Sequence, residues 1–422
     1  MIRIELPLSK SQINRALIIV AAKGNLSEWL NQNPDIAKRG CRDTRLLIEA
    51  LSLFAEEESS VDFYDAGTPC RLFTAFAASN LKRALTITGN ASLCNRRISP
   101  LLDALTQMGA QVEYHNMAGY PPFSLQKSVE QWQDVQISVA VSSQFASALL
   151  LVAPLFSGTK KITLTEISHS QTYVDLTIHC LKNIGIVVNS TYVRETREIS
   201  ILGTYDSVPH PSRELLELES DWSSAAFFYP LLLGLKTKTC LLLEGLKLDS
   251  RQGDSQLKTL GLLLGIETRE HAEGAVICRI DNTQELLEDS EDETLFVPLH
   301  DNPDLVPALV VGWCILGKSV MLQGIENLKF KECDRIAALQ ENLSRLNCTL
   351  EPWAETEDLW YLDASNRTFP TALQVETHDD HRIAMAFSAL KPWIQDLNFS
   401  NVECVEKSYP HYWEQWKKCT FE

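Results

Sequence analysis

The stretch Leu101–Tyr114, which reads LLDALTQMGAQVEY, runs from an amphipathic helical pattern through Gly109 into a short strand-like pattern. Glycine or asparagine at that point favours the left-handed backbone that ends a helix and starts a strand. Three later segments repeat this order at intervals of about 80 residues: Leu176–Val188, Leu257–Thr268 and Ile336–Leu350, with Gly185, Gly265 and Asn347 at the turn. This spacing predicts repeated structural units.

Short strand-like runs such as Lys161–Glu166 and Cys240–Glu244 lie between these segments. Strands that alternate with helices in βαβ-like units predict an α/β or α+β fold. The chain has 422 residues. Because single cores stop growing near about 250–300 residues, we expect two domains. The polar stretch Val208–Arg213 is a candidate crossover between them.

The formal net charge is -17, which disfavours general binding to nucleic acid. Anionic ligands would instead require lysines and arginines gathered at a few places. No apolar run reaches the roughly 18 residues that span a bilayer. The chain starts with the strand-like pattern Met1–Leu6 and shows no signal peptide, so we expect a cytoplasmic protein.

The sequence contains 11 cysteines and no CxxC pair, a pattern that predicts neither a zinc site nor a disulfide framework. Cys240, Cys278 and Cys314 lie in apolar stretches. We expect these three to be reduced thiols that fill a core.

Three polar motifs in the first half precede helical patterns: SKSQINRA at Ser9–Ala16, DAGTPCR at Asp65–Arg71 and SSQF at Ser142–Phe145. Exposed N–H groups at a helix start favour an anion, and Lys10 and Arg15 add positive charge there. Each motif alone is better explained by helix capping or by a solvated surface.

Three charged motifs in the second half also precede helices: NPDL with Asp304, KECDR at Lys331–Arg335 and DDHRIAM at Asp379–Met385. They offer carboxylates for proton transfer and arginine forks for phosphate or carboxylate. A metal held by His378, Asp380 and His381 is conceivable, but that spacing matches no established site.

Together, five strings resemble the 5-enolpyruvylshikimate-3-phosphate (EPSP) synthase family in order and wording, from Leu6 to Trp413: SKSxxNRA, AGTxxR, SSQF, KECDR and DDHRIAM. The resemblance implies two similar domains, each of three βαβαββ units around parallel helices, with the active site in a cleft that closes on ligand. One domain would span Lys10–Leu218. The other would combine Met1–Ser9 with Glu219–Glu422.

The resemblance also implies transfer of the enolpyruvyl group of phosphoenolpyruvate to the 5-hydroxyl of shikimate 3-phosphate. Asp304 would take the hydroxyl proton, and Glu332, assisted by Lys10, would serve the methylene carbon. The expected contacts of shikimate 3-phosphate are Lys10, Ser11, Arg15, Ser142, Ser143, Gln144, Ser170, Tyr173, Asp304, Asn327 and Lys331. Those of phosphoenolpyruvate are Lys10, Gly67, Arg96, Gln144, Arg335, Arg382 and Lys407. We expect a monomer that needs no cofactor or metal and binds neither nucleic acid nor membrane.

Four positions depart from the family pattern: Leu8 stands for glycine, Asp65 for asparagine, and Arg97 and Thr172 for proline. None removes a catalytic group, but Asp65 adds negative charge beside an expected anion site. Gly67 keeps its place, which predicts sensitivity to glyphosate.

Three alternatives remain open. The related transferase acting on UDP-N-acetylglucosamine would show Ser-Lys-Asn and a reactive loop cysteine, whereas Ser11 follows Lys10 here. A catalytically inactive, anion-binding homologue is opposed by the presence of Asp304, Glu332 and Lys10. An RNA-processing enzyme built from the same units is disfavoured by the negative charge.

Overall fold

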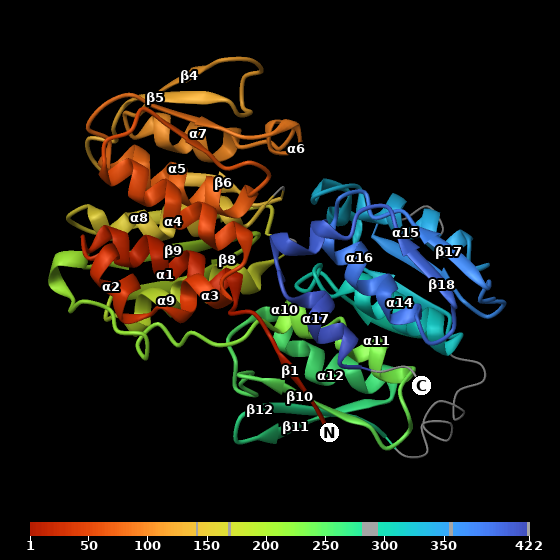
Figure 1. The fold of residues 1–422 in the computed structure, drawn as a ribbon. Coiled ribbons are helices and arrows are strands. Elements are labelled where there is room, and N and C mark those ends of the chain that lie inside the picture. The colour runs from red at the N-terminus through yellow and green to blue at the C-terminus, as the bar shows by residue number, and fades with distance from the viewer. Residues whose placement is uncertain (141, 168–169, 281–293, 354–357, 420–422) are drawn as a thin grey trace. The chain divides into compact units, whose positions relative to one another are not determined.

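The computed structural model describes residues 1–140, 142–167, 170–280, 294–353 and 358–419 (Figure 1). The chain forms two compact units. We call Leu8–Leu218 the inserted unit, and Met1–Pro7 with Glu219–Glu422 the split unit. Val208–Arg213 lies inside the inserted unit rather than at its boundary. The two chain crossings are tied together in the split unit, where the Asp221 N–H donates to the Pro7 carbonyl at 3.0 Å.

Four sheets share one topology, in which two parallel strands are followed by an antiparallel hairpin. In the split unit, β1 (Ile2–Glu5), β10 (Cys240–Glu244), β11 (Ile266–His271) and β12 (Gly274–Arg279) have the order β1-β10-β12-β11. There too, β13 (Leu295–Pro298), β14 (Val320–Gln323), β15 (Thr349–Pro352) and β16 (Leu359–Asp363) have the order β13-β14-β16-β15.

The two sheets of the inserted unit repeat this order. The first contains β2 (Ser60–Asp62), β3 (Leu85–Thr88), β4 (Gln111–Tyr114) and β5 (Phe123–Lys127), ordered β2-β3-β5-β4. The second contains β6 (Val135–Ser138), β7 (Lys160–Thr165), β8 (Val187–Val193) and β9 (Thr196–Leu202), ordered β6-β7-β9-β8. Each sheet is one βαβαββ repeat. Among the described residues, a further repeat in the split unit is reduced to the parallel pair β17 (Ala372–Val375) and β18 (Asp396–Phe399).

Helices form the interior of each unit. Those of the inserted unit are α1 (Lys10–Ala22), α2 (Leu26–Gln32), α3 (Asp35–Arg39), α4 (Arg42–Ala55), α5 (Gly67–Asn80), α6 (Ala91–Cys94), α7 (Ser99–Gln107), α8 (Gln144–Val152) and α9 (Gln171–Asn183). Those of the split unit are α10 (Trp222–Ala225), α11 (Phe228–Leu233), α12 (Leu257–Leu260), α14 (Val306–Leu316), α15 (Arg335–Ser344), α16 (His381–Phe387) and α17 (Tyr412–Lys417).

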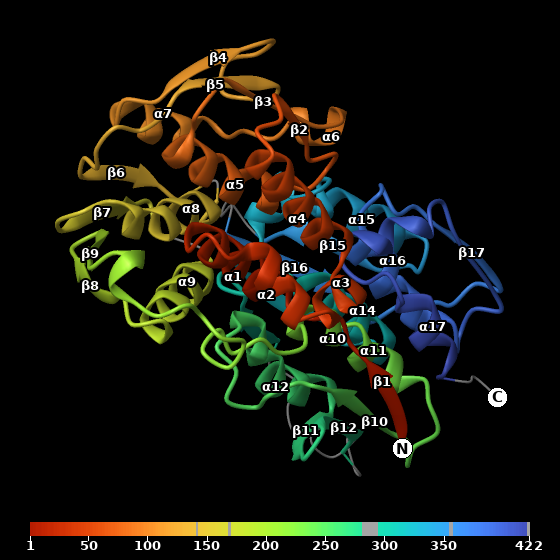
Figure 2. The same ribbon diagram turned by 60° about the vertical axis from the view of Figure 1, so that its left-hand side comes forward.

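The burial of two helices explains why the sheets lie on the outside of each unit. In α8 and α14 nearly every side chain is buried, so these helices are apolar all round and occupy the centres of their units. Strands β8 and β11 instead keep exposed residues on their outer face. Figure 2 shows the sheet of β6–β9 beside α8 and α9 in the inserted unit. The first turn of each inner helix is therefore the natural place for polar groups.

The predicted helix ends are confirmed. Gly109, Gly185, Gly265 and Asn347 have φ angles of 101°, 98°, 70° and 57°, which lie in the left-handed region. The strands β4, β8, β11 and β15 follow them as expected.

The expectation for two of the cysteines is wrong. Cys240 and Cys278 form a disulfide, because β10 and β12 are antiparallel and place these residues directly opposite each other, with a Cα–Cα distance of 4.5 Å. The sequence separation of 38 residues and the lack of a CxxC pair hid this pairing. Cys314 is a buried free thiol, as predicted.

Among the described residues, no helix is both long and apolar enough to cross a membrane.

Candidate active site

Seven charged residues converge in the split unit, and we call them the charge cluster: Asp304, Glu332, Arg335, Asp380, His381, Arg382 and Lys407. Most of these residues lie at or just before the start of a helix. Asp304 lies in the turn before α14, Arg335 begins α15, and His381 and Arg382 begin α16. Lys407 ends the 3-10 helix η7 (Glu403–Lys407).

Asp304 is held by two arginines. Its Oδ1 accepts from Arg335 Nη1 at 3.0 Å, and its Oδ2 accepts from Arg382 Nη2 at 2.7 Å. The side chains of Arg335 and Arg382 are only 2% and 6% exposed, whereas that of Asp304 is 19% exposed. This carboxylate therefore has both a fixed orientation and access to solvent.

Asp380 connects the charge cluster to the start of α16. It is fully buried, accepts from Arg335 Nε at 2.7 Å, and caps α16 by accepting from the Arg382 N–H at 2.8 Å. The residues before it, His378 and Asp379, have φ angles of 51° and 57°. Two consecutive left-handed residues other than glycine cost about 1–3 kcal/mol each and occur mainly at functional sites.

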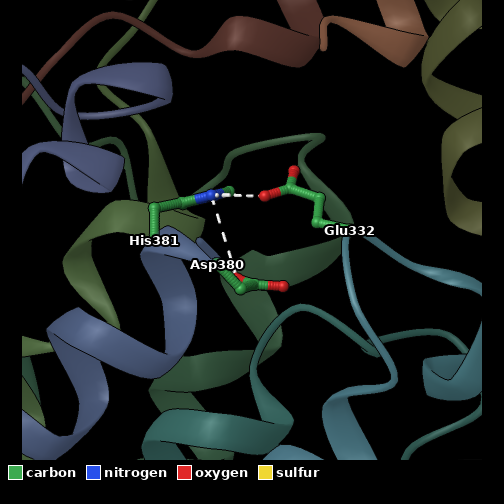
Figure 3. A group of neighbouring side chains, drawn as sticks. All are labelled: Glu332, Asp380 and His381. Atoms are coloured by element: carbon green, nitrogen blue, oxygen red, sulfur yellow. Dashed lines mark hydrogen bonds and ion pairs between the residues drawn. The ribbon is translucent and has the colours of Figure 1, made fainter. Parts of the chain in front are cut away.

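Glu332 makes ion pairs with a histidine, as Figure 3 shows, and with a lysine. Its Oε2 accepts from His381 Nδ1 at 2.8 Å, and its Oε1 is 3.3 Å from Lys407 Nζ. His381 Nε2 is 2.8 Å from the Ser408 hydroxyl. Since Glu332 can only accept, Nδ1 carries the proton and Nε2 accepts from Ser408.

The electrostatics keep Glu332 ionised. Burial alone would raise its pKa, but the charges of His381 and Lys407 outweigh burial and lower the pKa well below its usual range. Burial also lowers the pKa of His381, against the charge of Glu332. His381 and Lys407 together therefore favour the ionised form of Glu332.

Glu332, Asp380 and His381 each place one possible metal-ligand atom within 4.8 Å of the others (Figure 3). Lys407 and Arg335 already neutralise the two carboxylates, so this grouping needs no metal for charge balance. His378 points elsewhere, with Nε2 2.8 Å from Glu341 Oε2.

In the inserted unit, Lys10 is at the first turn of α1. Its Nζ is 3.1 Å from Oδ2 of the buried Asp43 on α4, and its side chain is 19% exposed. The neighbouring hydroxyls of Ser9 and Ser11 are 3.1 Å apart. An amine held by a buried carboxylate next to a hydroxyl pair suits the recognition of an anion that also carries hydroxyl groups.

Arg15 is more buried than a simple anion-binding residue needs. Its guanidinium donates to the Ser11 and Tyr173 carbonyls and to the hydroxyls of Ser147 and Thr177, at 2.7–3.1 Å. Burial lowers its pKa. The observed contacts make Arg15 the link between α1, α8 and α9.

Gln144 and the loop before α5 form a second polar group. Gln144 accepts from Arg71 Nη1 at 2.6 Å and donates to the Thr68 hydroxyl at 2.8 Å. A Cβ on Gly67 would lie 3.1 Å from Arg96 Nη1 and 3.3 Å from Arg71 Nη1. Burial and the charge of Arg96 lower the pKa of Arg71 to about 10. Two arginines thus lie against a glycine at a helix start.

The other expected residues occupy the starts of α8 and α9 and the segment before α15. Ser142 Oγ accepts from the Gln144 N–H at 3.2 Å, and the Ser143 carbonyl accepts from Ser147. Ser170, with a φ of 56°, precedes α9, and Tyr173 lies in its first turn. Asn327 is in the 3-10 helix η5 (Glu326–Phe330), which Lys331 follows directly.

The structure gives three departures from the family pattern a physical role. Leu8 is buried in the core of the inserted unit. Arg97 donates from Nε to the Ser99 hydroxyl at 2.7 Å. Asp65 Oδ1 accepts from Arg42 Nη2 at 2.8 Å, so an arginine balances the added charge.

Several residues at these sites were missed from the sequence. Asp380 and His381 lay within the DDHRIAM string but were given no role in substrate binding or catalysis. Asp43 and Arg42 had no local signal, because their partners Lys10 and Asp65 lie on other helices or loops.

Comparisons with known proteins identify the family. The family model described as EPSP synthase (3-phosphoshikimate 1-carboxyvinyltransferase) matches residues 38–416. The 3-phosphoshikimate 1-carboxyvinyltransferase of Bacteroides fragilis is 31% identical over 421 residues, covering 99% of this chain and 95% of the relative. That of Haemophilus ducreyi is 28% identical, covering 98% and 95%.

Solved structures show the same fold. EPSP synthase from Acinetobacter baumannii matches with a TM-score of 0.66 at 19% identity, covering 99% of this chain and 95% of that one. The enolpyruvyl transferase NikO from Streptomyces tendae matches with a TM-score of 0.60 at 13% identity, covering 99% and 94%. With its sequence matched over nearly the whole length and its fold shared, this chain belongs to the EPSP synthase (3-phosphoshikimate 1-carboxyvinyltransferase) family.

Proposed function

We propose that this chain transfers the enolpyruvyl group of phosphoenolpyruvate to the 5-hydroxyl of shikimate 3-phosphate and releases phosphate, as a cytoplasmic monomer. The observation that carries the proposal is the charge cluster. It holds two partly accessible carboxylates, Asp304 and Glu332, among the cations Arg335, Arg382 and Lys407. Two phosphorylated and carboxylated substrates need this combination of acid/base groups and cations.

The chemistry requires one base and one acid. The π electrons of phosphoenolpyruvate take a proton at the methylene carbon, from Glu332, and positive charge develops at the neighbouring carbon. The 5-hydroxyl oxygen attacks that carbon while Asp304 takes its proton. The new methyl group then returns a proton to Glu332 as the phosphate leaves with its bonding electrons. Asp304 passes the hydroxyl proton to the departing phosphate or to solvent, so both carboxyls regain their starting protonation states and no redox partner is needed.

The cations serve the anionic groups of the substrates. We assign Arg335, Arg382 and Lys407 to phosphoenolpyruvate, together with Arg96, Gly67 and Gln144 from the inserted unit. Shikimate 3-phosphate is assigned to Ser11, Arg15, Ser142, Ser143, Gln144, Ser170, Tyr173, Asp304, Asn327 and Lys331. Lys10 is assigned to both substrates and assists Glu332. Arginine forks match carboxylate and phosphate oxygens in pairs.

The direct test is phosphate release by the purified protein given phosphoenolpyruvate alone, with shikimate 3-phosphate, or with UDP-N-acetylglucosamine. Release only with shikimate 3-phosphate supports the proposal. Release with the nucleotide sugar would assign the chain to the related transferase. Binding of shikimate 3-phosphate without any release would indicate an inactive homologue.

Replacing Gly67 by alanine should weaken phosphoenolpyruvate binding. The new methyl group would press on the flexible ends of Arg96 and Arg71, so the protein folds while the arginines shift. We expect KM for phosphoenolpyruvate to rise about tenfold, the loss of about 1.4 kcal/mol, with a smaller change in kcat. An unchanged KM would remove Gly67 from the site.

Glyphosate should inhibit the wild-type protein well below millimolar concentration.

Arg42 should matter more than Asp65. Arg42→Gln removes a positive charge that pairs with Asp65 next to the expected anion site, so KM for phosphoenolpyruvate should rise about five- to tenfold. Asp65→Asn should change this KM less than about twofold. The double variant should recover most of the loss. If Arg42→Gln and Asp65→Asn raise KM independently, their pairing is not the cause.

A further inference from the structure

The turn that carries Asp304 is anchored from behind by Asn302, whose side chain is 1% exposed. Asn302 Nδ2 donates to the Gly253 carbonyl at 2.9 Å and to Oδ1 of Asp254 at 3.4 Å. The Asn302 carbonyl in turn accepts from the Leu305 N–H at 3.0 Å, which closes the turn around Asp304. The orientation of Asp304 therefore depends on a segment far away in the sequence.

Asp254 is itself buried, with 3% of its surface exposed, at the start of the 3-10 helix η3 (Gly253–Gln256). The Ser223 hydroxyl donates to its Oδ2. Burial and the charge of Asp304 raise the pKa of Asp254 to about 7, while Arg382 opposes the shift. The negative charge of Asp304 thus acts on Asp254.

Gln252, just before this pair, is also buried and reaches the chain crossing. Its Nε2 donates to Glu219 Oε1 and to the Ser220 carbonyl, both at 2.8 Å. Its Oε1 accepts from the Trp222 N–H at 3.1 Å. The segment Gln252–Asp254 thus connects the start of the long split-unit segment to the turn of Asp304.

We propose that Asp254 is a positioning residue for Asp304 and acts on it through Asn302. The proposal rests on the proposed function, in which Asp304 takes the hydroxyl proton. Proton transfer needs heavy atoms within about 2.6–3.2 Å, so a small displacement of the turn slows the reaction. Only 3% of the surface of Asp254 is exposed, so we assign it to the support of the base and not to contact with the substrate.

The test compares kcat and KM for shikimate 3-phosphate in Asp254→Ala, Asn302→Ala and the double variant. Each single change should lower kcat about 10- to 100-fold, while KM changes less than about threefold. The double variant should be no slower than the slower single variant, because both changes break one link. Asp254→Asn keeps an acceptor for Asn302 and should recover most of the kcat lost in Asp254→Ala.

Asn33→Ala is the matched control. Asn33 is a buried asparagine of the inserted unit whose Nδ2 donates to the Trp29 carbonyl at 2.8 Å. This control should lower Tm and leave kcat unchanged. Losses of kcat that multiply in the double variant would overturn the proposal, and so would a wild-type kcat in Asp254→Ala. An inactive wild-type protein would instead refute the proposed function.

If Asp254→Ala does not fold, Asn302→Ala carries the test alone, and a wild-type kcat in it overturns the proposal.

A second measurement is the Tm of Asp254→Asn relative to wild type. Asp254 faces Asp221, Asp304 and Arg382, and its pKa is about 7 when folded against 3.8 as the ordinary value. The folded protein therefore holds the extra proton between these values, and the wild type loses stability as pH rises. The advantage of the asparagine variant should grow from pH 4 to 7 and then stay constant. An advantage that does not change with pH would mean that Asp254 is not buried beside Asp304.

Discussion

Asp304→Asn should lower kcat for phosphate release by about 10³-fold, within the usual range for removing a general base. The amide has the same shape as the carboxylate but cannot take the proton of the 5-hydroxyl. Its oxygen can still accept from one of the two arginines that now hold the carboxylate, Arg335 and Arg382. Binding of shikimate 3-phosphate should therefore persist. The measurement is steady-state phosphate release with both substrates saturating.

Asp35→Asn is the control for this change. Asp35 pairs with Arg213 Nη1 at 2.6 Å in the inserted unit, so the substitution breaks an aspartate–arginine pair that is unrelated to the charge cluster. It should leave kcat unchanged. A kcat for Asp304→Asn within tenfold of wild type would show that another group takes the hydroxyl proton.

The repeat pattern could be predicted from the sequence because it rests on local backbone chemistry. Gly109, Gly185, Gly265 and Asn347 each end a helix in the left-handed region, and a glycine or asparagine at that point is visible in the sequence. The pairing of Cys240 with Cys278 could not be predicted, since it depends on which strands become neighbours.

The same distinction applies to the site. Asp304, Glu332 and the arginines lie in strings that could be recognised, but their partners depend on tertiary structure. Asp43 reaches Lys10 from α4, and Asp254 reaches Asn302 from η3. The departure from the family pattern at Asp65 led to the expectation of added negative charge beside an anion site, whereas the structure pairs Asp65 with Arg42. A residue's charge has a consequence only together with its neighbours.

The charge cluster also suggests how binding prepares the chemistry. In the structure, Arg335, Arg382 and Lys407 make ion pairs with the carboxylates of Asp304 and Glu332. Phosphoenolpyruvate, as we assign it, would take over these cations with its own carboxylate and phosphate. The carboxylates would then lose the positive charges that stabilise their ionised forms. Binding itself would make them better at holding a proton.

This effect of binding should be clearest at Glu332, because its pKa in the structure lies well below its usual range. An acid that gives a proton to the methylene carbon must first hold one. When the substrate neutralises Lys407, one of the influences that lower the pKa of Glu332 is removed, so this pKa should rise. Glu332→Gln cannot carry the proton, so we expect kcat to fall about 10²- to 10³-fold. KM for phosphoenolpyruvate should stay unchanged or fall, because the negative charge of Glu332 no longer competes for Lys407.

Glu341→Gln is the matched control, since Glu341 Oε2 is also 2.8 Å from a histidine nitrogen, that of His378, but lies at the exposed surface.

The stability of the protein gives a second measurement of the role of Glu332. A pKa that is lowered in the folded protein stabilises it fully above about pH 4.5, the ordinary value, and this stabilisation is lost as pH falls further. Glu332→Gln should therefore lower Tm by about 3–8 °C at pH 7 and by progressively less below pH 4.5. A rise in KM without a fall in kcat would mean that Glu332 orients the substrate and transfers no proton.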